Sequence, residues 1–139
     1  MYSLKAMEHF MDPQNAGVIT GDGDGDGGGD GGGHRVASQV LRGEATNTDC
    51  GDTALLTLRI SDGIIVDARF LSKGCAGAIA CCSATTVWLR GRGVAEAKTL
   101  VAATIAALLD GLPEAKMGCA TMAATAALAA LATAGDGSA

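Results

Sequence analysis

Aromatic side chains are scarce in this sequence: one Trp, one Tyr and two Phe occur among 139 residues. Hydrophobic residues nevertheless make up 48% of the chain, and much of that share is alanine. Because aromatic side chains supply the largest buried areas in most protein cores, their scarcity predicts a core of small side chains between closely packed helices. A chain of this length is expected to form one domain, residues 1–139, with a modest core.

Histidine and clustered basic residues are also scarce. Two histidines and the lack of any Gly-Lys-Ser/Thr element give no support to a hydrolase triad or a phosphate-binding loop. The net charge is −5, and no cluster of Lys and Arg indicates nucleic-acid binding. Four of the negative charges lie in the glycine-rich segment 20–33, and without these four the net charge is only −1.

We expect neither export nor membrane insertion. The first 13 residues contain no apolar segment of the kind that a secretory signal requires. The alanine-rich segment near the C-terminal end is expected to be too short, too rich in Thr and too weakly hydrophobic to span a membrane. Five cysteines in such a chain favour a reducing compartment, the cytoplasm, and thiols used for metal or sulfur chemistry.

Alternating hydrophobicity predicts three strands, and longer segments without helix breakers predict helices. The strands are expected at 36–45, 53–60 and 64–70, the last two joined by a turn at Asp62-Gly63. The helices are expected at 4–11, 76–90, 94–98, 100–109 and 117–133. Three strands followed by a run of helices predict an α+β fold, a small three-stranded antiparallel sheet with helices packed on one face.

The Asp-Gly turn also predicts the register of the hairpin. A two-residue turn pairs Ser61 with Ile64, so the numbers of paired residues sum to 125. Extended to the open end, this register places Cys50 opposite Cys75, at the spacing of about 5 Å that separates facing residues. The hairpin is therefore expected to bring two thiols and the Asp52 carboxylate together. It also assigns the apolar residues of each strand to one face: Leu56, Leu58 and Ile60, then Val66, Ala68 and Phe70.

Two features near the N-terminal end are interpreted as structural. The segment 20–33 fits a dinucleotide fingerprint and the start of a calcium loop, but no helical pattern follows and Gly33 stands where a calcium loop has Glu. We expect a flexible loop, because ordering many glycines costs conformational entropy; weak divalent binding is the alternative. His9 is expected to be a partly exposed surface residue. It lies off the apolar stripe of the first helix, which consists of Leu4, Met7, Phe10 and Met11.

Three cysteines and one aspartate form the candidate site. Cys75 precedes a helix and Cys119 lies in the first turn of the last helix, so both thiols are expected near backbone N–H groups that favour a thiolate. Cys50 and Asp52 lie in the loop that enters the hairpin. Three thiolates and a carboxylate suit tetrahedral zinc or an iron–sulfur cluster. Spacing alone groups Cys50, Asp52 and Cys75, and does not add Cys119.

Burial as a small hydrophobic residue is the alternative interpretation for a free cysteine. This interpretation is disfavoured for Cys50, which lies in a polar, turn-rich part of the sequence. It is favoured for Cys81 and Cys82, which lie among Ala and Ser in the middle of a predicted helix. Cys82 also lies about 10 Å along the helix axis from Cys75, too far to bind the same atom.

A series of short motifs points to one known family. The motifs are Tyr2-Ser3, His9-Phe10-x-x-Pro13-x-Asn15-x-Gly17, Cys50-Gly51-Asp52, Asp67-Ala68-Arg69-Phe70, Gly74-Cys75, Ala78-Ile79-Ala80 and Leu112-Pro113-x-x-Lys116-x-x-Cys119. In this combination the chain resembles the U-type iron–sulfur cluster assembly scaffolds, which have the IscU/NifU-like fold. The resemblance covers nearly the whole chain apart from the glycine- and aspartate-rich segment.

The resemblance implies a scaffold and not an enzyme. On such a scaffold a transient [2Fe–2S] cluster is built from iron and from sulfur that a cysteine desulfurase delivers, and it is then handed to apo iron–sulfur proteins. The ligand cysteines implied are Cys50, Cys75 and Cys119, and Asp52 matches the aspartate associated with cluster release. A carboxylate in place of a fourth thiolate suits temporary storage, because it is the harder ligand. Zinc could fill the same site.

Three departures from the family pattern stand out. Gly118 occupies a position where many scaffolds carry a histidine, and Cys81 and Cys82 occupy positions usually held by serine. The stretch 112–116, Leu-Pro-Glu-Ala-Lys, differs from the Leu-Pro-Pro-Val-Lys of members with a recognised Hsp70-type chaperone site.

Two functions follow from the resemblance. A zinc-bound persulfide acceptor also lacks the histidine, but that branch carries an insertion between the second and third ligand cysteines, which this chain does not have. We therefore expect the cluster scaffold, as a monomer or weak homodimer, with the zinc-bound sulfur acceptor as the alternative. A paralogue that keeps the fold and has lost the function is a third alternative.

Overall fold

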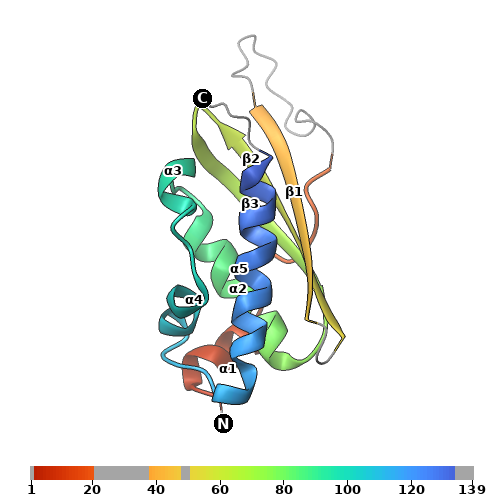
Figure 1. Ribbon diagram of the computed structural model, residues 1–139, viewed down its shortest axis with the longest axis vertical. Helices are drawn as coiled ribbons and strands as arrows, with labels where there is room; N and C mark the ends of the chain where they lie inside the picture. The colour runs from red at the N-terminus through yellow and green to blue at the C-terminus, as the bar shows by residue number, and fades with distance from the viewer. Residues whose placement is uncertain (1, 21–37, 48–50, 134–139) are drawn as a thin grey trace.

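The computed structural model describes residues 2–20, 38–47 and 51–133. Strands β1 (Ser38–Asn47), β2 (Asp52–Ser61) and β3 (Ile64–Lys73) form an antiparallel sheet in the order β1-β2-β3. The helices are α1 (Leu4–Met11), α2 (Ala76–Leu89), α3 (Val94–Ala97), α4 (Ala102–Leu108) and α5 (Met117–Ala132), with a short 3-10 helix at Glu114–Lys116. Helix α5 packs on β1 and β2, and α2 packs on β3, on the same face of the sheet (Figure 1). The α+β fold predicted from the sequence is confirmed.

The turn between β2 and β3 forms where the sequence predicts it. Asp62 and Gly63 have φ values of 56° and 76°, as both central residues of a type I′ turn must. Ser61 pairs with Ile64 across this turn. The Asp-Gly dipeptide therefore fixes where the chain reverses direction between β2 and β3.

A β-bulge then changes the register of the hairpin. Arg59 pairs with Asp67, so Val66 is an extra residue on β3. Beyond the bulge the paired numbers sum to 126, and Thr53 lies opposite Lys73. The predicted constant register is therefore wrong over most of the ladder. The predicted pairing of Cys50 with Cys75 involves a residue that lies outside the described part of the chain.

The bulge also decides which side chains of β3 reach the core. Ile65 is fully buried, whereas Val66 is 46% exposed, so the prediction that Val66 shares the face of the buried residues is wrong. The other five predicted members of the hairpin face are buried: Leu56, Leu58, Ile60, Ala68 and Phe70.

Small side chains let α5 approach the sheet closely. Six alanines of α5 are buried, together with Cys119, Met122 and Leu131. At Gly43 of β1 the approach is closest: a Cβ atom there would lie 2.1 Å from the backbone oxygen of Ala126. The scarcity of aromatic residues thus corresponds to a helix that lies directly on the backbone of the sheet, as predicted.

The helical stretch Glu114–Ala132 is the candidate membrane span among the described residues. With 19 residues and a mean hydropathy of 1.4, it is long and apolar enough to cross a bilayer, contrary to the expectation from the sequence. Half of it is buried inside the fold, where α5 packs against β1 and β2. A helix that is buried in this way is typical of the core of a soluble protein.

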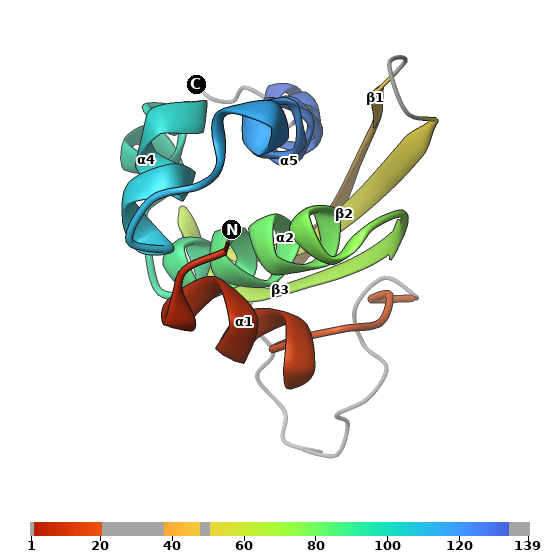
Figure 2. The ribbon, with the colours of Figure 1, turned by 90° about the horizontal axis from the view of Figure 1, so that it is seen from below.

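Residues 12–20 form a strap that runs from α1 to the opposite face of the sheet (Figure 2). Ala16 forms an isolated parallel bridge with Phe70 at the outer edge of β3. Farther along, the backbone N–H of Ile19 donates a hydrogen bond of 3.0 Å to Oγ1 of Thr57. Thr57 is fully buried although it points away from the helices. The strap therefore covers Thr57 on the face of the sheet that the helices leave open.

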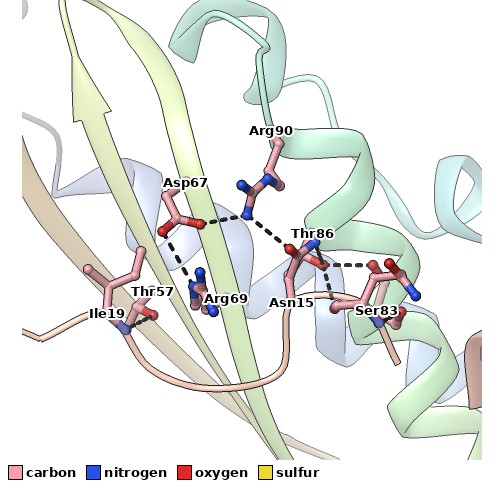
Figure 3. A network of polar contacts seen from close by, with 9 residues as sticks. Asn15, Ile19, Thr57, Asp67, Arg69, Ser83, Thr86 and Arg90 are labelled. Atoms are coloured by element: carbon pink, nitrogen blue, oxygen red, sulfur yellow. Dashed lines mark hydrogen bonds and ion pairs between the residues drawn. The ribbon is translucent and has the colours of Figure 1, made fainter. Parts of the chain in front are cut away.

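A clasp of polar side chains holds the strap against β3 and α2 (Figure 3). Arg90 donates hydrogen bonds from Nη1 to Oδ1 of Asn15, at 2.9 Å, and to Oδ1 of Asp67, at 2.6 Å. Asn15 also donates from Nδ2 to Oγ1 of Thr86 at 3.1 Å. One arginine thus joins three segments that are far apart in the sequence.

His9 is partly exposed, as predicted. Its Nδ1 atom lies 2.7 Å from Oγ of Ser83, which also accepts a hydrogen bond from the backbone N–H of Gln14. The Ser83 hydroxyl can then donate a hydrogen bond to Nδ1 of a neutral imidazole, whose own proton in that tautomer is on Nε2. Burial, and secondarily the charge of Lys5, lower the pKa of His9 below its ordinary value of 6.5, while Glu8 acts in the opposite direction.

This arrangement predicts a loss of stability in mild acid. Because the pKa of His9 is lower in the folded chain, the unfolded chain binds the proton first as the pH falls below about 6.5. The free energy of unfolding should therefore decrease with pH in that range, and it should decrease less in His9→Gln. Urea unfolding at several pH values measures this difference; equal pH dependence in the two proteins would contradict it.

Candidate metal centre

Cys75 is the N-cap residue of α2 and is separated from the end of β3 by Gly74 alone. Its φ and ψ of −80° and 175° are extended, as expected of an N-cap. Cys75 is partly exposed, so its thiol is accessible from solvent. As predicted from the sequence, it lies where the free N–H groups of a helix favour negative charge.

Cys119 comes from the opposite end of the sequence. It is the third residue of α5, a position that the packing of α5 on β1 and β2 sets. Its Sγ atom lies 3.8 Å from Sγ of Cys75. The N-terminal ends of the two longest helices therefore meet with one thiol each, which the resemblance implied and the spacing could not show.

Asp52 supplies the third donor. It is the first residue of β2 and is 7% exposed. The backbone N–H of Cys75 donates a long hydrogen bond, 3.4 Å, to Oδ2 of Asp52. This approach requires glycine at Gly74, because a Cβ atom there would lie 2.5 Å from Cγ of Asp52. The Gly-Cys pair after β3 thus lets the carboxylate lie beside the thiol.

The donor atoms of Asp52, Cys75 and Cys119 all lie within 4.8 Å of one another. Within residues 2–20, 38–47 and 51–133, no other group of three His, Cys, Asp or Glu side chains meets this criterion. Two sulfur atoms and one carboxylate oxygen suit zinc or an iron–sulfur unit and do not suit the oxygen-binding Mg²⁺ or Ca²⁺. Cys50, the fourth predicted ligand, lies outside the described residues.

The two thiols differ in their surroundings. Burial, together with the neighbouring Cys75, raises the pKa of Cys119 to about 12. Cys119 is therefore a protonated thiol until a positive charge enters the site and displaces its proton. Cys75, at the surface, is the thiol that a large partner meets first.

Two further residues, which the local sequence pattern did not identify as site residues, border the site. Lys116 directs Nζ toward Sγ of Cys75 at 3.7 Å, and the charges of Cys75 and Tyr2 raise its pKa above the ordinary value. The hydroxyl of Tyr2 lies against the backbone of Gly77, and burial raises the pKa of Tyr2. Both residues belong to motifs that carry the family resemblance, and Lys116 also stands three residues before Cys119, about one helical turn away.

Gly118 leaves space beside Cys119. A Cβ atom at Gly118 would lie 2.9 Å from Nδ2 of Asn47, so Asn47 occupies the position into which a side chain would project. A cleft of about 270 Å³ opens between the end of β1 and the first turns of α5. It is lined by Ala45, Thr46, Asn47, Gly118, Thr121, Met122 and Thr125.

Cys81 and Cys82 are buried in α2, as the sequence predicted. Burial raises the pKa of both thiols, that of Cys82 to about 12. Neither belongs to the group of donor atoms around Cys75. Both residues are therefore core side chains in this structure.

Comparison with known sequences gives a family match over nearly the whole chain. The family described as "NifU-like N terminal domain" matches residues 1–134. The chain is 34% identical over 132 residues to the iron–sulfur cluster assembly scaffold protein IscU of Escherichia coli K12, covering 94% of this chain and 91% of that one. It is 39% identical over 123 residues to the nitrogen fixation protein NifU of Nostoc sp. PCC 7120, and there it spans 37% of the length of the relative.

Solved structures share the fold at lower identity. The scaffold protein for the SUF system from Fervidobacterium islandicum aligns with a TM-score of 0.68 at 19% identity, over 94% of this chain and 96% of that one. The N-terminal part of a NifU-like protein from Brucella abortus aligns with a TM-score of 0.52 at 15% identity, over 90% and 76% of the two chains. On the family match and the identity to IscU, this chain belongs to the NifU-like N-terminal domain family, a family of iron–sulfur cluster assembly scaffold proteins and not of enzymes.

Proposed function

We propose that this protein is a scaffold on which a [2Fe–2S] cluster is assembled transiently and from which it is transferred to apo-proteins. The observation that carries the proposal is the convergence of Cys75, Cys119 and Asp52, whose donor atoms lie within 4.8 Å of one another. In this proposal Cys50 completes the ligand set. The cluster is cargo, built from iron and from sulfur that a cysteine desulfurase supplies.

The character of the site supports temporary binding. Asp52 offers a hard oxygen ligand where a permanent cluster site uses a fourth thiolate, so the cluster is held less firmly. Cys75 is partly exposed at the protein surface, within reach of a donor or an acceptor protein. Lys116, 3.7 Å from the sulfur of Cys75, provides a positive charge beside the negatively charged cargo.

A second function is favoured by one position. Gly118, beside Cys119, has no side chain, and Asn47 lies over it. Position 118 therefore cannot supply a nitrogen atom as an additional metal ligand. Such a site suits zinc bound by three thiolates and a carboxylate. In that case the protein accepts persulfide sulfur from a desulfurase and passes it on.

Anaerobic reconstitution separates the two functions. The protein is supplied with ferrous iron, cysteine and a cysteine desulfurase, and the visible absorption and the metal content are recorded. A cluster that forms and then moves to an apo-ferredoxin supports the scaffold. Stoichiometric zinc that resists exchange, without any cluster, supports the sulfur acceptor and overturns the first proposal.

Replacing Asp52 by cysteine should slow the release of the cluster. The substitution converts the proposed ligand set into four thiolates, the ligation of stable clusters. The half-life of the reconstituted cluster in the presence of a chelator should increase by about 10-fold or more, since single changes around metal sites alter affinity by this amount. Asp67→Cys, away from the site, serves as the matched control. Equal half-lives in Asp52→Cys and the wild type would contradict the role of the carboxylate.

The partners and the location follow from the same proposal. We propose a cysteine desulfurase as sulfur donor, apo iron–sulfur proteins as recipients and the cytoplasm as the compartment. The four free cysteines within the described residues agree with a reducing environment. Co-purification with a desulfurase, lost in Cys75→Ala or Lys116→Glu, would support this partner.

A further inference from the structure

The outer face of α1 carries large apolar side chains. Leu4 is 82% exposed, Met11 73%, Met7 45% and Phe10 38%. The inner side of the helix rests on α2, and Ala6 is the buried residue of α1. Figure 2 shows α1 below α2, with no other labelled helix or strand beyond it. The predicted apolar stripe of this helix therefore faces outward.

The spacing of these side chains is that of a helix–helix contact. Leu4, Met7 and Met11 recur at intervals of three and four residues, as the apolar residues do along the seam of two paired helices. Phe10 borders this seam on one side. Contiguous exposed apolar residues on a small protein mark an interaction surface more often than isolated ones do.

The charges on the other side of the seam indicate the partner. With 100° between successive residues, Lys5, Glu8 and Asp12 lie along one flank, with the positive charge near the start of the helix and a negative charge at its end. In an antiparallel pair of identical helices, this flank meets itself in reverse order. Lys5 of each copy then faces Asp12 of the other, whereas in a parallel pair this charged flank would face the opposite flank of the partner helix, where Phe10 lies, and form no ion pair.

We propose that α1 is a self-association surface, through which two copies of this chain pair with antiparallel α1 helices. Leu4 of one copy lies against Met11 of the other, and the two Met7 side chains lie near the two-fold axis. A helix of eight residues is about 12 Å long, so this contact buries less than the roughly 1,600 Å² of a standard interface. The dimer is therefore weak and reversible. This inference does not depend on the proposed function.

Sedimentation equilibrium of the full chain, without an N-terminal tag, tests the proposal. The wild type should form dimers as the concentration rises toward about 1 mM, the range in which small interfaces associate. Leu4→Lys or Met11→Lys should raise the dissociation constant at least about 10-fold, because each removes apolar burial on both copies. Val101→Lys, at a residue that is 54% exposed outside α1, is the matched control and should leave association unchanged.

Charge reversal tests the antiparallel arrangement. Lys5→Glu or Asp12→Lys alone should weaken the dimer, and the two together should restore it, because the double change rebuilds both ion pairs. Glu8 lies near the axis and faces its own copy, so Glu8→Gln should strengthen the dimer. Circular dichroism confirms that each variant is folded.

Three results would overturn the proposal. The first is a wild-type chain that stays monomeric at all concentrations, which is also expected if α1 binds a different protein. The second is an equal effect of Val101→Lys and Leu4→Lys on the dissociation constant. The third is a double charge variant that associates no better than Lys5→Glu or Asp12→Lys alone.

Discussion

Replacing Cys119 by alanine is expected to lower the affinity of the site for zinc by about 100-fold or more. The loss of a residue that only supports a metal ligand already costs 10- to 100-fold, and Cys119 is proposed as a ligand itself. Its Sγ atom lies 3.8 Å from that of Cys75, so one ion can contact both. Competition with a chromophoric chelator measures the affinity.

Cys82→Ala provides the matched control for this experiment. It removes a buried thiol from the same protein, but Cys82 lies outside the group of donor atoms. In the Co²⁺-substituted protein, the absorbance of the thiolate-to-metal charge-transfer band should decrease in Cys119→Ala by the contribution of one thiolate. It should remain unchanged in Cys82→Ala. A Cys119→Ala variant that binds zinc and accepts a cluster like the wild type would remove Cys119 from the site.

Replacing Gly43 by alanine is expected to cost about 3 kcal/mol of folding stability or more, at the upper end of overpacking effects. The added Cβ would lie 2.1 Å from the backbone oxygen of Ala126 and 2.4 Å from the backbone nitrogen of Ala130. Backbone atoms of a helix do not move aside as a flexible side chain does, so α5 must shift as a whole. The midpoint of thermal unfolding should fall by roughly 10 °C for a domain of this size.

Gly93→Ala is the matched control. Gly93 has a φ of −70°, which any residue adopts, and the nearest atom to an added Cβ lies at 3.8 Å. Because Gly93 is the N-cap residue of α3, alanine there should cost at most about 1 kcal/mol, well below the cost expected at Gly43. Similar unfolding midpoints for Gly43→Ala and Gly93→Ala would show that α5 does not rest on β1 as closely as the structure has it.

The elements of the fold were predictable because each is encoded in local periodicity. The Asp62-Gly63 dipeptide specified the hairpin turn, and Ser3, which accepts a hydrogen bond from the N–H of Ala6, specified the start of α1. The register was not predictable. Ile64, Ile65 and Val66 are three consecutive apolar residues, so alternation does not tell which of them faces the core.

The site could be predicted only in part, for a similar reason. Asp52 and Cys75 lie at the ends of one hairpin, where local reasoning brings them together. Cys119 joins them because α5 packs across β1 and β2, a tertiary contact that no spacing in the sequence encodes. Only the likeness to a known family supplied that residue. Tyr2 and Lys116 approach the thiols through the same packing and were not identified as site residues.

The orientation of the apolar face of α1 was not predictable from the sequence either. Its apolar residues fall on one side at helical spacing, as the sequence showed, and such a side usually faces the core. Here the small Ala6 is the buried residue of the side that packs on α2, and the larger Leu4, Met7 and Met11 are exposed. A hydrophobic pattern identifies a face of a helix, but it does not tell whether that face points toward the core.

The extra residue at Val66 has a consequence for how relatives of this chain are compared. It adds one residue between Asp52 and Cys75 without lengthening the sheet. The number of residues between these two donors therefore includes the bulge as well as the paired strands. A homologue that builds the same sheet with uninterrupted pairing would need one residue fewer over this interval. A gap of one residue at this place in an alignment therefore indicates a strand without the bulge, and not a thiol in a different position.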